Sequence, residues 1–305
     1  MEIAPITLIT FNRPETTKRV FDVIREQKPS KLFLVSDGPR DGVVLDVERV
    51  EQTRVILNQV DWPCEVHRLY FETNQGCGKS LPMSLDWVFQ SVDSSIILED
   101  DCLPGVDFFR FCSELLIKYK SENKIFSIGG HRNDGPDEID GDSYFYSKYP
   151  AIWGWATWKN RWEVFDLEMK QWPMLSESNW LRNVLGQHKF ELYWKRLFDK
   201  MATDHHVWDY ALFYSCWLNK KINIRSKVNL IENIGFGSDA THTKTEQERS
   251  FTRRIGEMPF SIIHPIELIV EDQTEHRIEW VNYSGMTERM LQNAHAQLKK
   301  RRGKH

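Results

Sequence analysis

The sequence predicts an α/β protein with a mostly parallel central sheet flanked by helices. Short apolar segments alternate with amphipathic segments four times in about the first hundred residues, which is the pattern of a doubly wound sheet. Residues 96–98 form an apolar run without alternation, as expected of a central strand covered on both faces. Glu99, Asp100 and Asp101 follow directly, and open α/β sheets bind their ligands beyond the carboxyl ends of the strands.

The first half of the chain supplies alternating strands and helices. Pro14 suits the first position of a helix, because its φ is preset and its missing N–H is not needed there. Polar turns such as Ser36-Asp37-Gly38-Pro39 separate the segments. The predicted strands are residues 5–11, 31–35, 65–70 and 96–98, and the predicted helices are residues 14–24, 46–60 and 81–90.

The second half is less regular. Residues 134–142 have the strongest loop composition in the chain, and residues 144–162 are crowded with Tyr, Phe and Trp. Pro259, just before the segment, and Pro265 within it make residues 260–270 an irregular or edge segment. The predicted strands are residues 125–128 and 222–225, and the predicted helices are residues 108–119, stretches within 179–201, an aromatic helix ending at Trp217, and residues 286–300.

Composition sets the class of the protein. Of 305 residues, 41% are hydrophobic and 28% are charged, with a net charge of −4, which is typical of a globular protein and gives no reason to expect nucleic acid. No apolar stretch approaches the ~20 residues of a transmembrane helix. Five cysteines without a Cys-x-x-Cys pair, and no signal-like start, predict a cytoplasmic protein with reduced thiols. A basic segment at residues 299–304 offers at most weak contact with an anionic membrane.

The three consecutive acids are the main candidate site. Side-by-side carboxylates repel one another and lose solvation unless a cation neutralises them, and oxygen ligands suit Mg²⁺ or Mn²⁺. Glu99, Asp100 and Asp101 are therefore a candidate metal and diphosphate site. A solvated acidic turn is the simpler interpretation, and it would prevail for an arbitrary Glu-Asp-Asp.

Residues 76–80 form a possible phosphate-binding loop. Gly-x-Gly-Lys-Ser resembles the end of a Walker motif, but Thr73 stands where that motif requires its first glycine. Backbone amides around Gly78, together with Lys79, remain able to meet a diphosphate. An ordinary strand-to-helix turn explains the same residues.

The aromatic region and Asp209 each allow two interpretations. Aromatic faces stack on sugars and bases, and Gly154 between two tryptophans suggests close approach of the backbone to another group. A hydrophobic core explains any single ring equally well. Asp209 begins an aromatic helix, where a carboxylate either caps the helix or lies beside a pocket with a shifted pKa.

The order of several motifs resembles a GT-A glycosyltransferase. The resemblance is closest to the inverting N-acetylglucosaminyltransferase I type and to bacterial family 2-like sugar transferases, and it covers residues 4–243. It implies a Rossmann-like, nucleotide-diphospho-sugar transferase fold. The motifs are Ile-Thr-Phe-Asn-Arg-Pro, Ser-Asp-Gly, Asn-Gln-Gly-x-Gly-Lys, Ile-Leu-Glu-Asp-Asp-Cys-Leu-Pro-Gly-Val-Asp-Phe-Phe, Trp-Gly-Trp and Trp-Asp.

The resemblance implies a role for each matching residue. On the donor side, Phe11 and Arg13 would line the nucleotide pocket, Asp37 would contact the uracil, and Asp100 would lie near the ribose. Glu99 would lie close to the sugar. Gly78 and Lys79 would also lie near the donor.

The resemblance also implies a metal and a general base. Asp101 would be the single protein ligand of Mn²⁺ (or Mg²⁺), with His242 near the metal. Asp209 matches the aspartate that acts as general base. The acceptor would meet the aromatic region, at Trp153, Gly154, Trp155 and Trp208.

We therefore expect a metal-dependent inverting glycosyltransferase of polysaccharide biosynthesis. It would move a sugar from a nucleotide-diphosphate donor, a UDP-sugar, to a hydroxyl of a saccharide or glycoconjugate. The alternatives are a sugar nucleotidyltransferase and a non-catalytic carbohydrate-binding protein. The expected domain is residues 1–243, with a nucleotide-sugar half (1–102) and an acceptor half (103–243). Residues 244–305 would form a flap and an extension ending in a basic helix.

Overall fold

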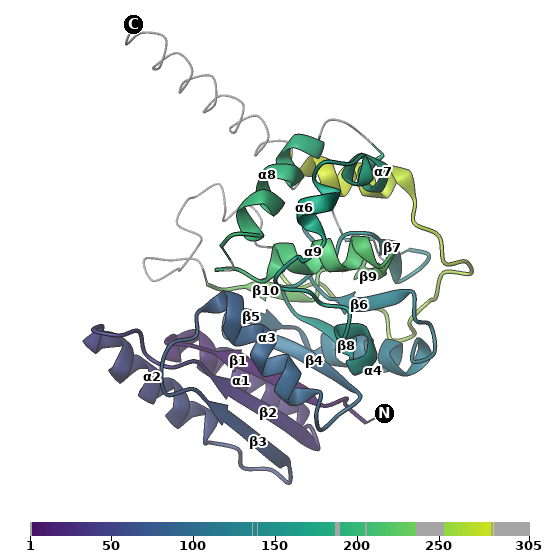
Figure 1. Ribbon diagram of the computed structural model, residues 1–305. Coiled ribbons are helices and arrows are strands. Elements are labelled where there is room, and N and C mark those ends of the chain that lie inside the picture. The colour runs from purple at the N-terminus through teal and green to yellow at the C-terminus, as the bar shows by residue number, and fades with distance from the viewer. Residues whose placement is uncertain are drawn as a thin grey trace, which may run out of the picture.

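An eight-stranded sheet organises the protein. The structure is a computed structural model that describes residues 2–135, 137, 138, 140–186, 190–204, 206–235, 253–281 and 283. The strands lie in the order β3-β2-β1-β4-β8-β6-β9-β7, and helices cover the sheet (Figure 1). This confirms the predicted fold class, an α/β protein with a mostly parallel central sheet flanked by helices.

The bounds of the elements agree with the sequence prediction best in the first half. The strands are β1 (Ile6–Thr10), β2 (Lys31–Ser36), β3 (Glu65–Tyr70), β4 (Ser94–Glu99), β5 (Cys102–Pro104), β6 (Ile125–Gly129), β7 (Tyr144–Ser147), β8 (Trp155–Trp158), β9 (Ile222–Ser226) and β10 (Ile231–Asn233). The helices are α1 (Pro14–Gln27), α2 (Val44–Leu57), α3 (Cys77–Val88), α4 (Val106–Lys118), α5 (Lys159–Trp162), α6 (Trp172–Leu175), α7 (Trp180–Leu185), α8 (Glu191–Met201) and α9 (Asp209–Leu218). A further helical stretch spans residues 272–281.

Strand direction places the loops that follow five of the strands at one edge of the sheet. β1 pairs in parallel with β2 and β4, and β2 pairs in parallel with β3. β8 runs antiparallel between β4 and β6, so β6 and its parallel neighbour β9 point the same way as β4. The carboxyl ends of β1, β2, β4, β6 and β9 therefore meet at one edge of the sheet.

Alternation along the strands builds two core layers. Ile96 and Leu98 pack with α1 and α4 residues on one face, while Ile97 packs with residues of α3, α8 and α9 on the other. This is why residues 96–98 carry no polar side chain: both faces of β4 are covered.

The aromatic region forms part of the core, which the sequence did not reveal. β7 and β8, which were not predicted, lie within residues 144–158. Tyr144, Tyr149 and Trp155 are buried. These rings fill the space between the sheet and the later helices, so packing determines their positions.

A small second sheet closes over the carboxyl edge. β10 pairs antiparallel with β5, which directly follows the acidic turn. Gly154 has a φ of +66°, and a Cβ on it would overlap the Ile231 side chain of β10. Glycine is needed there both for the backbone conformation and for the close approach.

Residues 253–281 return to the main body. Ile262 and Ile278 are buried in the two core layers, and Tyr146 bridges to Val270 beside β7. Part of the segment expected as an extension therefore packs on the sheet edge, in agreement with the prediction for residues 260–270. Among the described residues, no helix has the length and apolarity needed to cross a membrane.

Gly154→Ala and Gly42→Ala together distinguish the loss of stability caused by backbone strain from the loss caused by overpacking. Gly42 also has a positive φ, +71°, but a Cβ there meets nothing within 4 Å. We expect Gly42→Ala to lower the free energy of unfolding by about 1 kcal/mol, the cost of the left-handed conformation. Gly154→Ala should cost ~1–3 kcal/mol more because of overpacking. Urea denaturation of both variants measures the difference, and equal losses would contradict the packing role.

Candidate functional site

The acidic turn lies at the centre of the carboxyl edge. Glu99 is the last residue of β4, and Asp100 and Asp101 form the turn before β5. β4 lies between β1 and β8, so loops from both halves of the sheet reach it. Asp100 is buried, while Glu99 and Asp101 are half-buried.

Arg13 ties the first loop to these acids. Its Nη1 lies 3.3 Å from Oδ1 of Asp100 and 2.6 Å from Oδ2 of Asp101. The backbone N–H of Phe11 donates to the other oxygen of Asp100 at 3.0 Å. The structure shows that Arg13 forms ion pairs within the acidic turn. Its contact with a nucleotide stays a prediction.

The charges of this cluster are strongly coupled. Burial, and then Asp101 and Asp100, raise the pKa of Glu99. Burial also raises the pKa of Asp100, against the lowering effect of Arg13. Burial disfavours the charged form of Arg13, yet Asp100 and Asp101 keep its pKa above the usual range. One arginine faces three carboxyls, so the cluster retains an excess of acid that a bound cation would stabilise.

The donor set fits a cation that is held mainly by a substrate. Within the described ranges, no group of three or more His, Cys, Asp and Glu side chains forms a metal cage. Mg²⁺ and similar ions often use only one or two carboxylates, with phosphate oxygens and water completing the shell. A Cβ on Gly235 would overlap the Asp101 carboxylate, so the chain after β10 lies directly against that group. His242 lies outside the described residues.

Asp37 orders the loop beside the acidic turn. Its carboxylate accepts hydrogen bonds from the N–H groups of Gly38 (2.8 Å), Gln75 (2.8 Å) and Gly76 (3.1 Å), and from Nδ2 of Asn74 (3.1 Å). Burial nevertheless raises its pKa. Four donors already occupy this carboxylate, so its structural role is to fix residues 74–76. Contact with a uracil stays a prediction.

The predicted glycine loop is the first turn of α3. The helix begins at Cys77, after Gly76 with a φ of +75°, and the amides of Lys79 and Ser80 already bond to the Gly76 carbonyl. Gly78 is buried and Lys79 is exposed. The predicted start at residue 81 was therefore wrong by four residues. A helix N-terminus remains suited to an anion.

Cys77 is a site residue that the sequence analysis did not identify. It is an exposed free cysteine, and its thiol interacts electrostatically with Glu99, Asp209 and Asp101. Desolvation by the surrounding protein, reinforced by these acids, raises its pKa. Its place between two glycines at the start of a helix was the available signal.

Asp209 joins the cluster from the other half of the chain. It is the first residue of α9, is half-buried, and accepts a hydrogen bond from the Tyr210 N–H at 2.9 Å. Trp208, not Asp209, is the N-cap residue, so the capping interpretation was wrong. Burial raises the pKa of Asp209 to about 6. Asp209 is close enough to contribute, after burial and the neighbouring acids, to the raised pKa of Glu99, so the start of α9 lies near the end of β4.

The predicted acceptor residues are mostly enclosed by protein. Trp155 and Trp208 are buried and stack on each other with centroids 5.8 Å apart. Gly154 is buried under β10. Trp153 is half-buried and lies 4.4 Å from the ring of His131. Of the four, Trp153 alone retains partial exposure, so a sugar-stacking role is a proposal for that residue only.

Further residues connect the loops beside Phe11 and Arg13. The guanidinium of Arg40 lies 5.5 Å from the centroid of the Phe11 ring and forms a bidentate pair with Asp46, at 2.5 and 2.8 Å. Asn12 donates to the same carboxylate at 2.7 Å. This network links the loops after β1 and β2. The sequence analysis missed it because the partners lie 6 and 34 residues apart.

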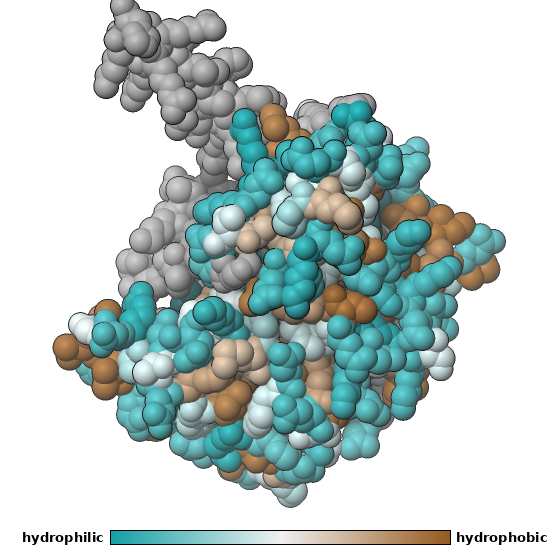
Figure 2. Space-filling view, in the orientation of Figure 1, coloured by the Kyte–Doolittle hydropathy of each residue, from teal (hydrophilic) through white to brown (hydrophobic). Residues whose placement is uncertain are grey.

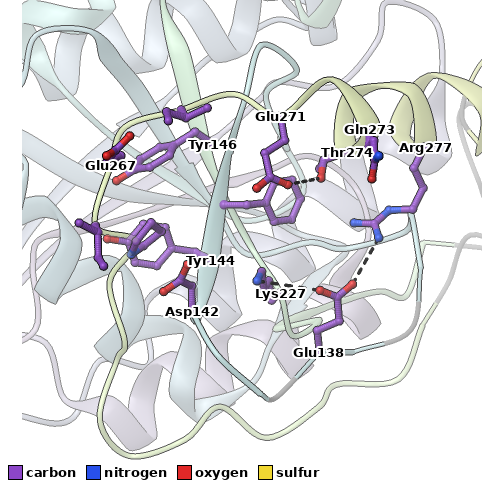
Figure 3. Close-up of a pocket in the computed structure, with 14 residues that line it drawn as sticks. Glu138, Asp142, Tyr144, Tyr146, Lys227, Glu267, Glu271, Gln273, Thr274 and Arg277 are labelled. Atoms are coloured by element: carbon purple, nitrogen blue, oxygen red, sulfur yellow. Dashed lines mark hydrogen bonds and ion pairs between the residues drawn. The ribbon is translucent and has the colours of Figure 1, made fainter.

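A cavity beside β7 is lined by none of the residues of the acidic turn. It has a volume of about 790 Å³ and lies between β7, residues 265–271 and the start of the helical stretch 272–281 (Figure 3). β7 is four strands from β4 in the sheet. The acidic turn and this cavity are therefore separate features of the molecule.

Comparisons with known proteins give weak matches. No protein-family model and no curated protein matches the chain. Solved structures include 4-diphosphocytidyl-2C-methyl-D-erythritol synthase from Anaerococcus prevotii DSM 20548, with 10% identity and a TM-score of 0.33 over 82% of this chain and 96% of that one. They also include UDP-glucose pyrophosphorylase in complex with UDP-glucose, with 10% identity and a TM-score of 0.39 over 76% of this chain and 93% of that one. The apo form of UDP-glucose pyrophosphorylase matches with 10% identity and a TM-score of 0.37 over 75% of this chain and 93% of that one.

Matches at this TM-score carry no inference about activity. The names of these similar structures belong to the class of the alternative in the sequence analysis, sugar nucleotidyl transfer, and not to that of glycosyl transfer.

Arg13→Gln tests whether the Arg13 guanidinium stabilises the acidic turn. Breaking a largely buried pair leaves unpaired charge, so we expect the free energy of unfolding to fall by about 3 kcal/mol. Added Mn²⁺ should restore part of the loss, because it supplies the missing positive charge. Lys18→Gln, which breaks an exposed pair with Asp22, is the control and should cost ~0.5 kcal/mol or less. Equal losses in thermal denaturation would contradict this role.

Proposed function

We propose that the protein is a metal-dependent transferase that acts on a nucleotide-diphosphate sugar at the carboxyl edge of its sheet. The proposed reaction is transfer of the sugar, with inversion, from a UDP-sugar to a hydroxyl of a saccharide or glycoconjugate. The observation that carries this proposal is the meeting of Asp209 with the acidic turn. A carboxyl with a pKa near 6 beside a candidate cation site combines a base with an electrophilic centre.

The first half of the sheet suits a nucleotide diphosphate. Arg13, the Phe11 N–H and the start of α3 converge near Asp100 and Asp101. A helix N-terminus and a guanidinium both favour phosphate oxygens. Asp101, at the exposed side of the turn, would hold a divalent cation together with the diphosphate. Such a cation supplies Lewis-acid stabilisation of the departing diphosphate.

The proposed chemistry is a single displacement. The oxygen of the acceptor hydroxyl attacks the anomeric carbon, and its proton passes to the Asp209 carboxylate. The bond from that carbon to the diphosphate oxygen breaks as the new bond forms, which inverts the anomeric configuration. Glu99 is near both Asp101 and Asp209, because each of these carboxyls raises its pKa. Its proposed place is therefore beside the sugar.

Sugar nucleotidyl transfer is the second candidate. It would use the same acidic turn to hold its metal ion and phosphates. It has no evident use for a base at Asp209, since its nucleophile is a phosphate oxygen. The products distinguish the two reactions. Glycosyl transfer releases a nucleoside diphosphate. In nucleotidyl transfer a sugar phosphate reacts with a nucleoside triphosphate, and pyrophosphate is released.

A non-catalytic carbohydrate-binding protein is the third candidate. It would have used the aromatic region, but Trp155 and Trp158 are buried there. Calorimetry with UDP and a panel of UDP-sugars, with Mn²⁺ and then with a chelator, tests the proposed donor. Metal-dependent binding of one UDP-sugar supports the proposal, and no binding under either condition rejects it.

Asp101→Asn should remove the metal dependence of nucleotide binding. The substitution keeps the shape of the side chain but removes the charge that would hold the cation. We expect the affinity for UDP with Mn²⁺ to fall to the value measured with a chelator. Asp93→Asn, at an exposed position, should behave as wild type in the same titration. Wild-type affinity of Asp101→Asn in Mn²⁺ would reject the metal assignment.

Asp209→Asn should abolish most of the sugar transfer while leaving donor binding intact. General-base catalysis is typically worth ~10²–10⁴-fold, so kcat should fall by that factor. In the wild type, Asp209 must be ionised to accept a proton, so kcat/KM should rise with pH through about 6 and then level. Asp204→Asn, at an exposed position, is the control. Near-wild-type turnover of Asp209→Asn, or a flat pH profile, would exclude the base role.

A further inference from the structure

We infer that the cavity beside β7 is a binding site for a neutral saccharide, separate from the acidic turn. Its volume of about 790 Å³ lies within the range of ligand pockets. Its lining combines hydrogen-bonding side chains with a few apolar groups (Figure 3). The inference does not depend on the reaction proposed above.

The walls of the cavity are fixed at both ends. Beside β7, the Ser143 N–H donates to the Ile263 carbonyl at 2.8 Å, and the Ile263 N–H donates to the Ser143 hydroxyl at 2.9 Å. Further along the segment, Val270 forms an isolated parallel β-bridge with Tyr146. Residues 264–269 therefore arch between two attachment points. A cavity held in this way is formed before any ligand arrives.

The floor is rigid as well. The hydroxyls of Tyr144 and Tyr146 each bond to the Tyr119 hydroxyl, at 2.5 and 2.7 Å. The Tyr144 hydroxyl also bonds to Nδ1 of His264 at 3.0 Å, which ties the arch to the floor. Both rings are buried. They support the cavity without offering a ring face to a ligand.

The charges argue against an anionic ligand. The two lining cations are already paired: Arg277 lies 3.1 Å from Asp134 and 3.3 Å from Glu138, and Lys227 lies 4.0 Å from Glu138. In the part of the chain that the structure describes, the lining acids Asp142, Glu267 and Glu271 form no ion pair. A phosphate or nucleotide would therefore meet uncompensated carboxylates, which excludes the donor of the proposed reaction from this cavity.

A neutral polyhydroxyl ligand uses this lining better than a cation does. Carboxylates accept from sugar hydroxyls in charge-assisted hydrogen bonds, and the amide of Gln273 donates to and accepts from the same kind of group. A cation would meet Lys227 and Arg277 in the same cavity, and the buried tyrosine rings are not available for cation–π contact. The exposed side chains of Ile266 and Ile269 suit the apolar C–H face of a sugar.

The position suggests a purpose for a second saccharide site. Four strand spacings separate β4 from β7, about 19 Å at the usual ~4.8 Å per strand. If the protein transfers sugar to a saccharide, a chain held beside β7 would extend from this cavity toward the acidic turn. Such an enzyme would favour long acceptors over short ones.

The test is binding of the full-length protein to an immobilised panel of neutral gluco-, galacto-, manno- and N-acetylglucosamine oligosaccharides, in a chelator and without nucleotide. Gln273→Trp places a large ring in the cavity from an exposed helical position, and we expect it to abolish binding. Asp272→Trp, at the neighbouring exposed position that does not line the cavity, should bind as wild type. Glu267→Gln keeps the shape but loses a charged acceptor, and affinity should fall about tenfold.

The outcomes separate this inference from the proposed function. Binding that Gln273→Trp abolishes and Asp101→Asn leaves unchanged supports a separate saccharide site. Binding to no member of the panel, or equal binding by Gln273→Trp and Asp272→Trp, overturns it, whether or not UDP binds with Mn²⁺.

Discussion

The uncompensated negative charge at the end of β4 is the constraint on which the site depends. A strand buried on both faces delivers three consecutive carboxyls to one turn, where they lose solvation together. Arg13 relieves only part of this cost, and in doing so it fixes the loop after β1. Gly235 allows the chain after β10 to lie directly against Asp101. The remaining excess of acid is what makes a cation an expected component.

The site is assembled from two halves that are far apart in sequence. β1, β2, α3 and β4 supply the side that suits a nucleotide diphosphate, and α9 supplies Asp209 more than a hundred residues later. The sheet makes this possible because the antiparallel β8 joins the parallel first half to β6 and β9. Both halves then open on one edge. Asp209, the proposed base, and the candidate cation site meet there although they are far apart in the sequence.

Tryptophans and tyrosines perform a structural task in the second half. Trp155 and Trp208 stack inside the core, and Tyr144 and Tyr146 share their hydroxyl bonds with Tyr119 below the cavity. Large rings, several of them from α8 and α9, fill the space between the sheet and the later helices. The cavity beside β7 arises because residues 264–269 leave the sheet edge between two attachments. Its place at the edge strand β7, four strands from β4, separates it from the acidic turn.

The sequence by itself determined the fold class, the first four strands and the acidic turn, because unbroken apolar runs and consecutive carboxyls are local signals. It also selected Asp209 and Arg13, through motif order. Only the tertiary structure decided which tryptophans are core and that Asp37 is saturated by four donors. It alone revealed that Cys77 lies beside the candidate site and that Arg40 and Asp46 link the loops after β1 and β2. Burial and hydrogen-bond partners depend on residues brought together from distant parts of the chain, and neither periodicity nor spacing records them.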